Sequence, residues 1–497
     1  MKIASSFVLW TLACASAAQQ VSNSYSSKKR LVEPQQLISD ISKRNLLDHA
    51  KKFVDFSKLS NGTRAFGTAG YNATIDYIRK ELLKTGYYNI ELQTFPFLYS
   101  TGSSTFSSNG TNYPANWFTY GPAGDVEAPV IHINNQGCNV TDYPTTVPGS
   151  IALILRGSCD FGLKAALAGA AGAVGVVIFN NVAGPINGGT FNLPTRPEGP
   201  YVPTAGISDA DGQAISDILS SGGEVIGSIH SEALNENRYS SNLLATSKSG
   251  NQNNIVMAGA HSDSVPAGPG INDNGSGSIG ILEVALQLSK YETKQAVRFG
   301  FWTAEESGLV GSSQYVTSLT TAQNQKIALY LNFDMIASPN YGHFIYDGDG
   351  SQFNITGPAG SDKIEKTFQD YFKSIKYPSG SAAFNGRSDY GPFLTGGIPA
   401  GGMNTGAEGI KTEEQVALWG GQAGVAYDKC YHQACDGIDN LAVDAFERNA
   451  KGIAYAVATY ARSIDNIPRA RNATVAAKLA SQLDSNSGSC DHAAVAM

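Results

Sequence analysis

Charged side chains are scarce in this chain. They make up 15% of its 497 residues, below the roughly 25% that is usual for soluble domains, and 42 acidic against 35 basic side chains give a net charge of −7. No basic run is longer than Lys28-Lys29-Arg30. Binding to nucleic acid or to anionic lipid needs clustered positive charge, so the sequence argues against both kinds of partner.

Long apolar runs are also missing. At the N-terminus, Lys2 precedes a short apolar stretch at 7–13 and the small residues 15–18, which is the pattern of a secretory signal peptide over residues 1–18. A buried N-terminal helix is the alternative. The stretch is shorter than the about 20 residues that span a bilayer, and no later segment is apolar enough over that length to span one. We therefore expect a secreted protein, or one delivered to the vacuolar lumen, with no membrane segment.

Cysteine is limited to six residues. Cys14 leaves with the signal peptide, and Cys490 is expected to be a free thiol in a flexible tail at 481–497. The other four form two close pairs that we predict to be disulfides, Cys138/Cys159 and Cys430/Cys435. Lys29-Arg30 has two interpretations, a processing site that ends a propeptide at 19–35, which would make the chain a zymogen, or a solvated charge cluster.

Asn-x-Ser/Thr triplets fit the same secretory route. We expect glycosylation at only part of the triplets, because the pattern is common by chance. The predicted acceptors are Asn61, Asn72, Asn109, Asn139, Asn354 and Asn472.

The hydrophobic pattern divides the chain into one interrupted domain and an insert. Helical spacing covers about 35–58 and 71–84, and strand-like runs alternate with a helix from about 254 to 333. This order predicts an α/β domain at 36–115 plus 237–480, with a mixed, largely parallel sheet flanked by helices. No internal repeat is present.

The insert at 116–236 has a different, β-rich character, with short strands at 130–133, 151–155 and 174–179. Gly172 follows a helix and precedes a strand, whereas a dinucleotide loop needs the order strand, glycine turn, helix, so this glycine is a helix cap. The motif Arg156-Gly157-x-Cys159-x-Phe161-x-x-Lys164 with the glycines that follow resembles the protease-associated domain. That resemblance implies a cover over a catalytic site or a partner-binding module, without chemistry of its own.

Carboxylates and a histidine follow the predicted strands of the α/β domain. His261 and Asp263 come after one strand, Glu305-Glu306 after the next and Asp334 after the third, and a glycine-rich loop carries Asp273. Taken singly, each has an ordinary structural explanation, such as a hydrogen-bonded His, a solvated Glu pair at a helix start or an Asp in a turn. Because the carboxyl ends of parallel strands meet at one edge, these groups would repel one another unless a cation lay between them.

A second histidine, His432, lies between Cys430 and Cys435, where a small disulfide loop would hold it rigidly. Two histidines and three carboxylates suit two Zn²⁺ ions that share one carboxylate. Thiolate ligands are not indicated, because the cysteines are expected to be oxidised.

The motifs together resemble the co-catalytic dizinc aminopeptidases of the bacterial and fungal leucine-aminopeptidase and aminopeptidase Y type. The stretches that carry the resemblance are His261-Ser262-Asp263-Ser264, Gly270 to Gly277, Ala304-Glu305-Glu306-Ser307-Gly308, Asn332-Phe333-Asp334-Met335, Gly386-Arg387-Ser388-Asp389-Tyr390 and Cys430-Tyr431-His432-x-x-Cys435-Asp436. They occur in the expected order, with no departure at a ligand position.

The resemblance implies a role for each residue. Asp273 would bridge two zinc ions, with His261 and Asp334 on one ion and Glu306 and His432 on the other. Glu305 would be the general base. Three further residues have implied roles around this centre: Asp263 would orient His261, Tyr431 would stabilise the oxyanion, and Arg387 would order the pocket for the free amino terminus. A cis peptide bond after Asp273 is also implied, which argues against glycosylation at Asn274.

The implied activity is release of N-terminal, Leu-like residues from peptides by a monomeric enzyme. A carboxylate-rich pocket favours an α-ammonium over a carboxylate, which supports an aminopeptidase. A glutamate-carboxypeptidase-like enzyme and an inactive receptor of the same fold are the alternatives. The chain has neither Gly-x-Ser-x-Gly nor His-Glu-x-x-His, so a serine hydrolase and a one-zinc metalloprotease of that type are disfavoured.

Overall fold

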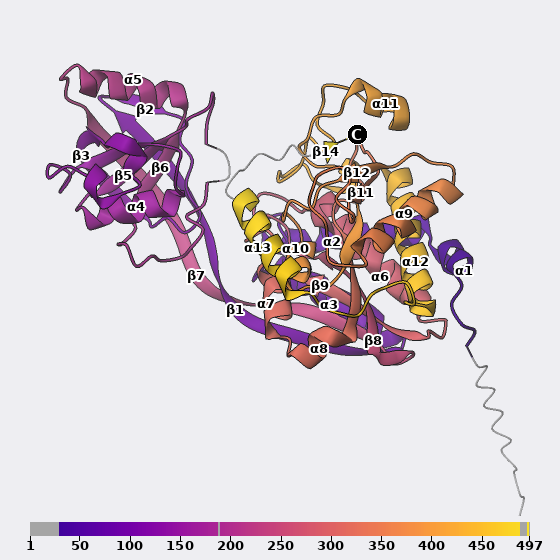
Figure 1. Ribbon diagram of the computed structural model, residues 1–497. Helices are drawn as coiled ribbons and strands as arrows, with labels where there is room; N and C mark the ends of the chain where they lie inside the picture. The colour runs from indigo at the N-terminus through magenta and orange to yellow at the C-terminus, as the bar shows by residue number, and fades with distance from the viewer. Residues whose placement is uncertain (1–28, 187–188, 488–494, 497) are drawn as a thin grey trace, which may run out of the picture.

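The computed structural model describes residues 29–186, 189–487 and 495–496 (Figure 1). The predicted signal peptide, most of the predicted propeptide and Cys490 lie outside these residues. Within the described residues, no helix has the length and apolar character needed to cross a membrane.

A mixed sheet forms the centre of the larger part of the molecule, here called the main lobe. Strands β13, β10, β8 and β9 run parallel to one another, and the strands at either side of them include antiparallel neighbours. The predicted fold class is therefore confirmed. In spatial order the strands are β14 Val495–Ala496, β12 Gly380–Ala382, β11 Phe344–Tyr346, β13 Ala400–Asn404, β10 Ile327–Phe333, β8 Asn251–His261, β9 Gln295–Trp302, β7 Ile226–Ser247 and β1 Tyr88–Ser108.

Helices cover both faces of this sheet, which explains why its central strands are apolar without alternation. All seven residues of β10 are buried, for example. On one face the helices are α1 Pro34–Asp40, α2 Lys43–Ser57, α3 Ala69–Lys84, α6 Gly277–Leu288, α9 Ser361–Ser374 and α12 Val443–Arg462. On the other face they are α7 Val310–Ser318, α10 Tyr390–Thr395, α11 Glu413–Trp419 and α13 Ala473–Ser487, while the short α8 Thr321–Lys326 leads into β10.

The insert is a second, smaller lobe with its own sheet and two apolar cores. Its strands β3, β4, β5 and β6 are parallel, and β7 pairs with β3 antiparallel. Its elements are β2 Thr111–Tyr113, β3 Gly124–His132, β4 Ile151–Leu155, α4 Phe161–Ala170, β5 Gly175–Phe179, β6 Thr204–Ile207 and α5 Asp209–Ser220. Gly172, at φ +87°, follows α4 as predicted for a helix cap.

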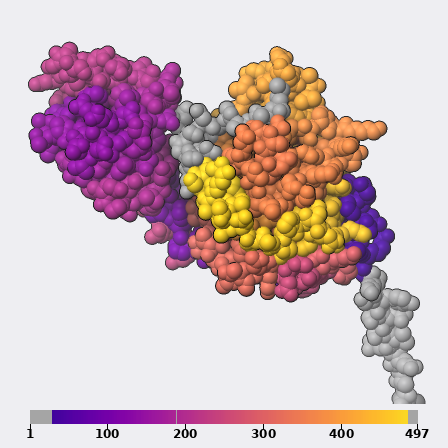
Figure 2. Space-filling model, in the orientation of Figure 1, coloured from indigo at the N-terminus to yellow at the C-terminus, as the bar shows by residue number. Residues whose placement is uncertain are grey.

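Two long strands join the lobes. β1 and β7 pair antiparallel from Tyr88↔Ser247 to Ser108↔Gly227. Between the stretches where β7 also pairs with β9 (243–246) and with β3 (226–231), the two strands form a stalk that carries the insert away from the main lobe (Figure 1). A strand of 21 residues is about 70 Å long at the usual rise per residue. Figure 2 shows the insert to one side of the main lobe.

Three elements differ from the sequence-based expectation. The helical region predicted at 35–58 is two helices, because the backbone is extended at Ile41 and the Ser42 hydroxyl caps α2 by accepting from the Asn45 N–H. α1 begins at Pro34, within the predicted propeptide, and Val32 is fully buried. Residues 481–487, predicted as tail, continue α13.

Both predicted disulfides, Cys138–Cys159 and Cys430–Cys435, are present. Asn274 is fully buried, consistent with the expectation that it carries no glycan. The six predicted acceptor asparagines are all exposed, and their glycosylation stays a prediction.

Candidate metal centre

Five predicted ligands meet at the carboxyl ends of the parallel strands. His261 is the last residue of β8, and Asp334 directly follows β10. Glu306 lies on the turn after β9, Asp273 in the segment Ile271–Ser276 that leads into α6, and His432 in the disulfide loop. The sheet topology therefore brings together residues from widely separated parts of the sequence.

The distances between these side chains fit two adjacent metal sites. His261 Nε2 lies 3.3 Å from Asp334 Oδ1 and 3.4 Å from Asp273 Oδ1. His432 Nε2 lies 3.0 Å from Glu306 Oε2 and 3.1 Å from Asp273 Oδ2. Ligand atoms around a tetrahedral zinc are about 3.3 Å apart, given bonds of about 2.0–2.2 Å. One oxygen of Asp273 faces each histidine, which is the arrangement of a bridging carboxylate.

Unsatisfied atoms at the centre point to the same conclusion. Glu306 Oε1 and Asp334 Oδ1 are buried, and neither has a hydrogen-bond partner among the described residues. A buried carboxylate oxygen without a partner is costly, and a divalent cation would remove that cost. The residues present therefore fit a pair of cations.

The electrostatics show how strongly this site attracts positive charge. Burial lowers the pKa of His432, but Glu306 and Asp273 outweigh burial and raise this pKa to about 11. Burial raises the pKa of Glu305 well above its usual range, and neighbouring carboxylates add to the effect. In the absence of a cation, protons neutralise the cluster. Zinc would displace them.

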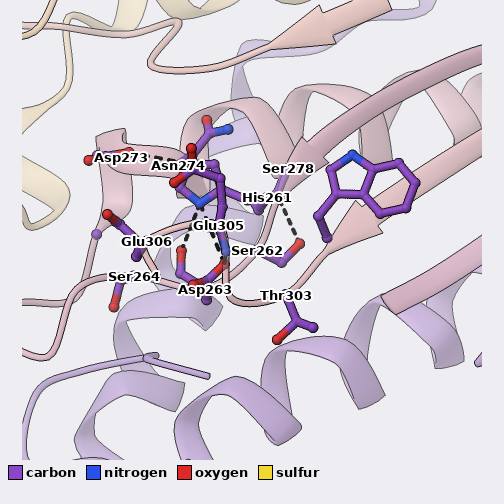
Figure 3. Close-up of polar contacts among 12 residues, drawn as sticks. His261, Ser262, Asp263, Ser264, Asp273, Asn274, Ser278, Thr303, Glu305 and Glu306 are labelled. Atoms are coloured by element: carbon purple, nitrogen blue, oxygen red, sulfur yellow. Dashed lines mark hydrogen bonds and ion pairs between the residues drawn. The ribbon is translucent and has the colours of Figure 1, made fainter. Parts of the chain in front are cut away.

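Asp263 and Glu305 lie beside His261 (Figure 3). His261 Nδ1 is 3.2 Å from the backbone oxygen of Asp263 and 3.6 Å from its Oδ1. The same Oδ1 accepts a hydrogen bond of 3.2 Å from the Glu305 N–H. Asp263 thus orients the ring of His261 mainly through its carbonyl and fixes the backbone of Glu305 through its carboxylate. The Glu305 side chain reaches to 3.8 Å from His261 Nε2.

Two buried aspartates, Asp428 and Asp436, join the loops that carry Asp273 and His432. Asp436 accepts from the backbone N–H groups of Asn272 and Asp273, each at 2.9 Å. Asp428 accepts from the side chain of Asn272 at 2.6 Å and from the Cys430 N–H at 2.8 Å. The peptide bond after Asp273 is cis, as the resemblance implied. Asp436 belonged to a recognised motif, but its role was not predicted.

Arg64 is a further supporting residue that the sequence did not indicate. It is fully buried and donates to three backbone oxygens of the loop after β8, those of Ser262 at 2.6 Å, Pro269 at 2.7 Å and Gly270 at 2.5 Å. Burial lowers its pKa to about 10, so the guanidinium stays charged at neutral pH. Arg64 therefore fixes the loop that connects His261 with Asp273.

The predicted pocket residue Arg387 contacts Tyr431 rather than standing free. Its guanidinium forms an ion pair of 3.1 Å with Glu408 and donates to the Tyr431 hydroxyl at 3.2 Å. The Tyr431 ring stacks on His432, with centroids 3.8 Å apart. Arg387 thus positions the phenol beside the second histidine.

A cavity of about 120 Å³ opens beside the ligands. Five ligands and Glu305 line it, together with polar residues such as Asn385 and Ser388 and a set of apolar and aromatic residues, here called the apolar wall. This wall could not be identified from the sequence, because its members come from several separate segments. The wall includes Met335, Tyr346, Ala382, Ala383, Tyr390 and Ala407.

A second acidic cluster, Asp347, Asp349 and Glu365, has a structural explanation. Asp347 accepts from the N–H groups of residues 351, 352 and 353, and Glu365 accepts from those of residues 348 and 349. These carboxylates stabilise the loop after β11 by accepting from its backbone.

Comparison with known proteins places the chain in a family. Residues 242–457 match the model of peptidase family M28, and residues 126–215 match the PA domain. The chain is 48% identical over 451 residues to a probable leucine aminopeptidase 2 of Aspergillus fumigatus, covering 90% of this chain and 89% of that protein. It is 46% identical over 442 residues to leucine aminopeptidase 2 of Arthroderma otae, covering 88% of each.

Two solved structures share the fold of this chain. An aminopeptidase from Aneurinibacillus sp. strain AM-1 superposes with a TM-score of 0.71 at 26% identity, covering 86% of this chain and 96% of that one. A zinc aminopeptidase from Bacillus subtilis has the same fold, with a TM-score of 0.62 at 24% identity and coverage of 86% and 96%. The chain belongs to peptidase family M28 and carries an inserted PA domain.

Proposed function

We propose that this metallo-aminopeptidase releases apolar, leucine-like residues from the N-termini of peptides, with two zinc ions held by the five clustered ligands. The observation that carries the proposal is the position of Asp273, whose two carboxylate oxygens lie within 3.4 Å of His261 and 3.1 Å of His432. The relatives named leucine aminopeptidase support the choice of substrate.

When bound, the zinc pair supplies a Lewis acid for the scissile carbonyl and lowers the pKa of a water. Glu305 accepts a proton from the attacking water and returns one to the leaving amine. Its position supports this role, because the Glu305 side chain lines the cavity beside the ligands and lies 3.8 Å from His261 Nε2. The Tyr431 hydroxyl, which accepts from Arg387, is the proposed donor to the oxyanion.

The pocket supports cleavage at an amino end. The carboxylates of the centre favour an α-ammonium group, and the 120 Å³ cavity with its apolar wall is suited to one leucine-sized side chain. A carboxypeptidase would need a free arginine for the substrate carboxylate. Arg387, the only arginine that lines this cavity among the described residues, is already paired with Glu408.

Four leucyl peptides test this proposal: one with both ends free, one N-acetylated, one C-amidated, and one blocked at both ends. We expect the free and C-amidated peptides to be cleaved at the first bond, and both acetylated peptides to be resistant. Cleavage of the acetylated peptide at the rate of the free one would overturn the assignment. Cleavage that requires a free C-terminus would point to the carboxypeptidase instead.

We also propose export, with signal removal, glycosylation of some of the six exposed asparagines and a monomeric active form. The two disulfides support an oxidising compartment. N-terminal sequencing of the natural protein tests the processing. A mature chain that begins at Met1 would contradict it.

A further inference from the structure

A second and larger cavity lies between the main lobe, the stalk and the insert. Its volume is about 570 Å³, and Glu306 and His432 line both this cavity and the smaller one. The two cavities therefore meet at the ligand cluster. The larger one is also lined by Tyr99 to Gly102 of the stalk and by Trp117 and Tyr120 of the insert.

Close packing fixes the wall that the insert contributes. A Cβ atom on Gly102 of the stalk would lie 2.7 Å from the ring of Trp117, so glycine is required for the indole to lie against the strand. The Tyr120 N–H donates to the Ser100 hydroxyl at 2.7 Å, and Asn235 donates to the Gly121 oxygen at 3.0 Å. These contacts tie the start of the insert to the stalk, so the wall is formed before any ligand binds.

The stalk contributes a strand edge as well as side chains. Four consecutive residues of β1, Tyr99 to Gly102, line the cavity, although alternate side chains of a strand point to opposite faces. At these positions β1 pairs with β7, and no other strand among the described residues pairs with it there. An extended peptide can therefore lie along this strand and use its backbone groups, as in other cases of strand addition.

The size and chemistry of the two cavities indicate what each holds. The 120 Å³ cavity accommodates one side chain, whereas 570 Å³ is within the roughly 300–1,000 Å³ of ligand-binding clefts. Aromatic rings, hydroxyls and backbone groups line the larger cavity, and none of its lining residues is Lys or Arg. Such a surface suits the uncharged middle of a peptide rather than its terminal carboxylate.

We propose that the insert and the stalk bind the part of a peptide substrate that follows the scissile bond, with Trp117 as the main aromatic contact. This inference rests on the proposed aminopeptidase function, because it assigns the smaller cavity to the first residue. The insert then has a definite role in substrate selection, since it favours peptides of several residues over single aminoacyl amides.

The test compares two substrates, leucinamide and the tetrapeptide Leu-Ala-Ala-Ala, which differ in the residues beyond the first bond. The measured quantity is the ratio of kcat/KM for the tetrapeptide to that for leucinamide. Trp117→Ala is expected to lower this ratio about tenfold, the order of effect of losing one aromatic contact. Thr101→Trp places a bulky side chain in the cavity from a strand position and is expected to lower the ratio by a similar factor. This variant provides the test if Trp117→Ala does not fold.

Tyr239→Ala is the matched control, because Tyr239 is a stalk residue that is 69% exposed and does not line the cavity. Its ratio should equal that of the unaltered protein. An unchanged ratio in folded Trp117→Ala and Thr101→Trp would overturn the inference, as would an equal fall in Tyr239→Ala. If the unaltered protein cleaves neither leucinamide nor the tetrapeptide, the proposed function itself is wrong. That result differs from an unchanged kcat/KM ratio in the variants, which overturns only the role of the insert and the stalk.

Discussion

Replacing Glu305 by Gln separates catalysis from metal binding. The side chain is 10% exposed and lies 3.8 Å from His261 Nε2, but it is not one of the five side chains assigned as ligands. The amide keeps the shape of the carboxylate and loses its ability to take a proton. Positioned general bases contribute about 10²–10⁴-fold to rate, so we expect kcat to fall by that factor, equivalent to about 3–5 kcal/mol of activation free energy.

The same substitution at the neighbouring residue is the control. Glu306 Oε2 lies 3.0 Å from His432 Nε2, so Glu306→Gln should lose one zinc ion as well as activity. Glu305→Gln should retain the zinc content and the unfolding temperature of the unaltered protein, because it removes one of several buried like charges. The assays are initial rates on leucinamide and zinc content by mass spectrometry. Near-normal turnover in Glu305→Gln, or loss of zinc from that variant alone, would refute the assignment of the two adjacent glutamates.

Three further predictions concern the supporting structure. Removing the Cys430–Cys435 disulfide by a double serine substitution should lower kcat/KM about tenfold or more, because His432 is then held less rigidly. The same substitution in the insert disulfide should leave kcat/KM unchanged. Equal kcat/KM values in the two variants would contradict the prediction. The affinity of the metal-free chain for zinc should rise between pH 6 and pH 8, by up to about tenfold per pH unit for each proton displaced. The reason is that carboxylates hold the pKa of His432 at about 11, so its proton must leave before zinc binds. Competition with a chelator measures this rise, and an affinity independent of pH would argue against it. Arg64→Met should lower the free energy of unfolding by about 3–5 kcal/mol, because three buried carbonyls lose their donor; a loss below about 1 kcal/mol in denaturant titrations would show that Arg64 is dispensable.

The sequence predicted the central strands and the meeting of the five candidate ligands because each signal is local. A run such as Ala328–Phe333, buried on both faces, predicts a covered parallel strand, and the polar residue that follows it must then lie at the sheet edge. The order of these strands was enough to bring His261 and Asp334 together.

The features that sequence did not reveal depend on contacts between distant residues. Arg64 reaches oxygens about 200 positions away, and nothing in its own surroundings marks it as buried. The length of β1 cannot be predicted from the sequence, because its second half is rich in serine, threonine and glycine. Pairing with β7, rather than the propensity of these residues, makes this half a strand. The larger cavity likewise depends on how the insert packs against the stalk.

Anomalous X-ray scattering at the zinc edge, from crystals grown with zinc and without chelator, would locate each metal ion relative to Asp273. We expect two peaks, one on either side of Asp273, with one about 2.0–2.2 Å from His261 and Asp334 and the other equally close to Glu306 and His432. A single peak, or two peaks that Asp273 does not bridge, would contradict it.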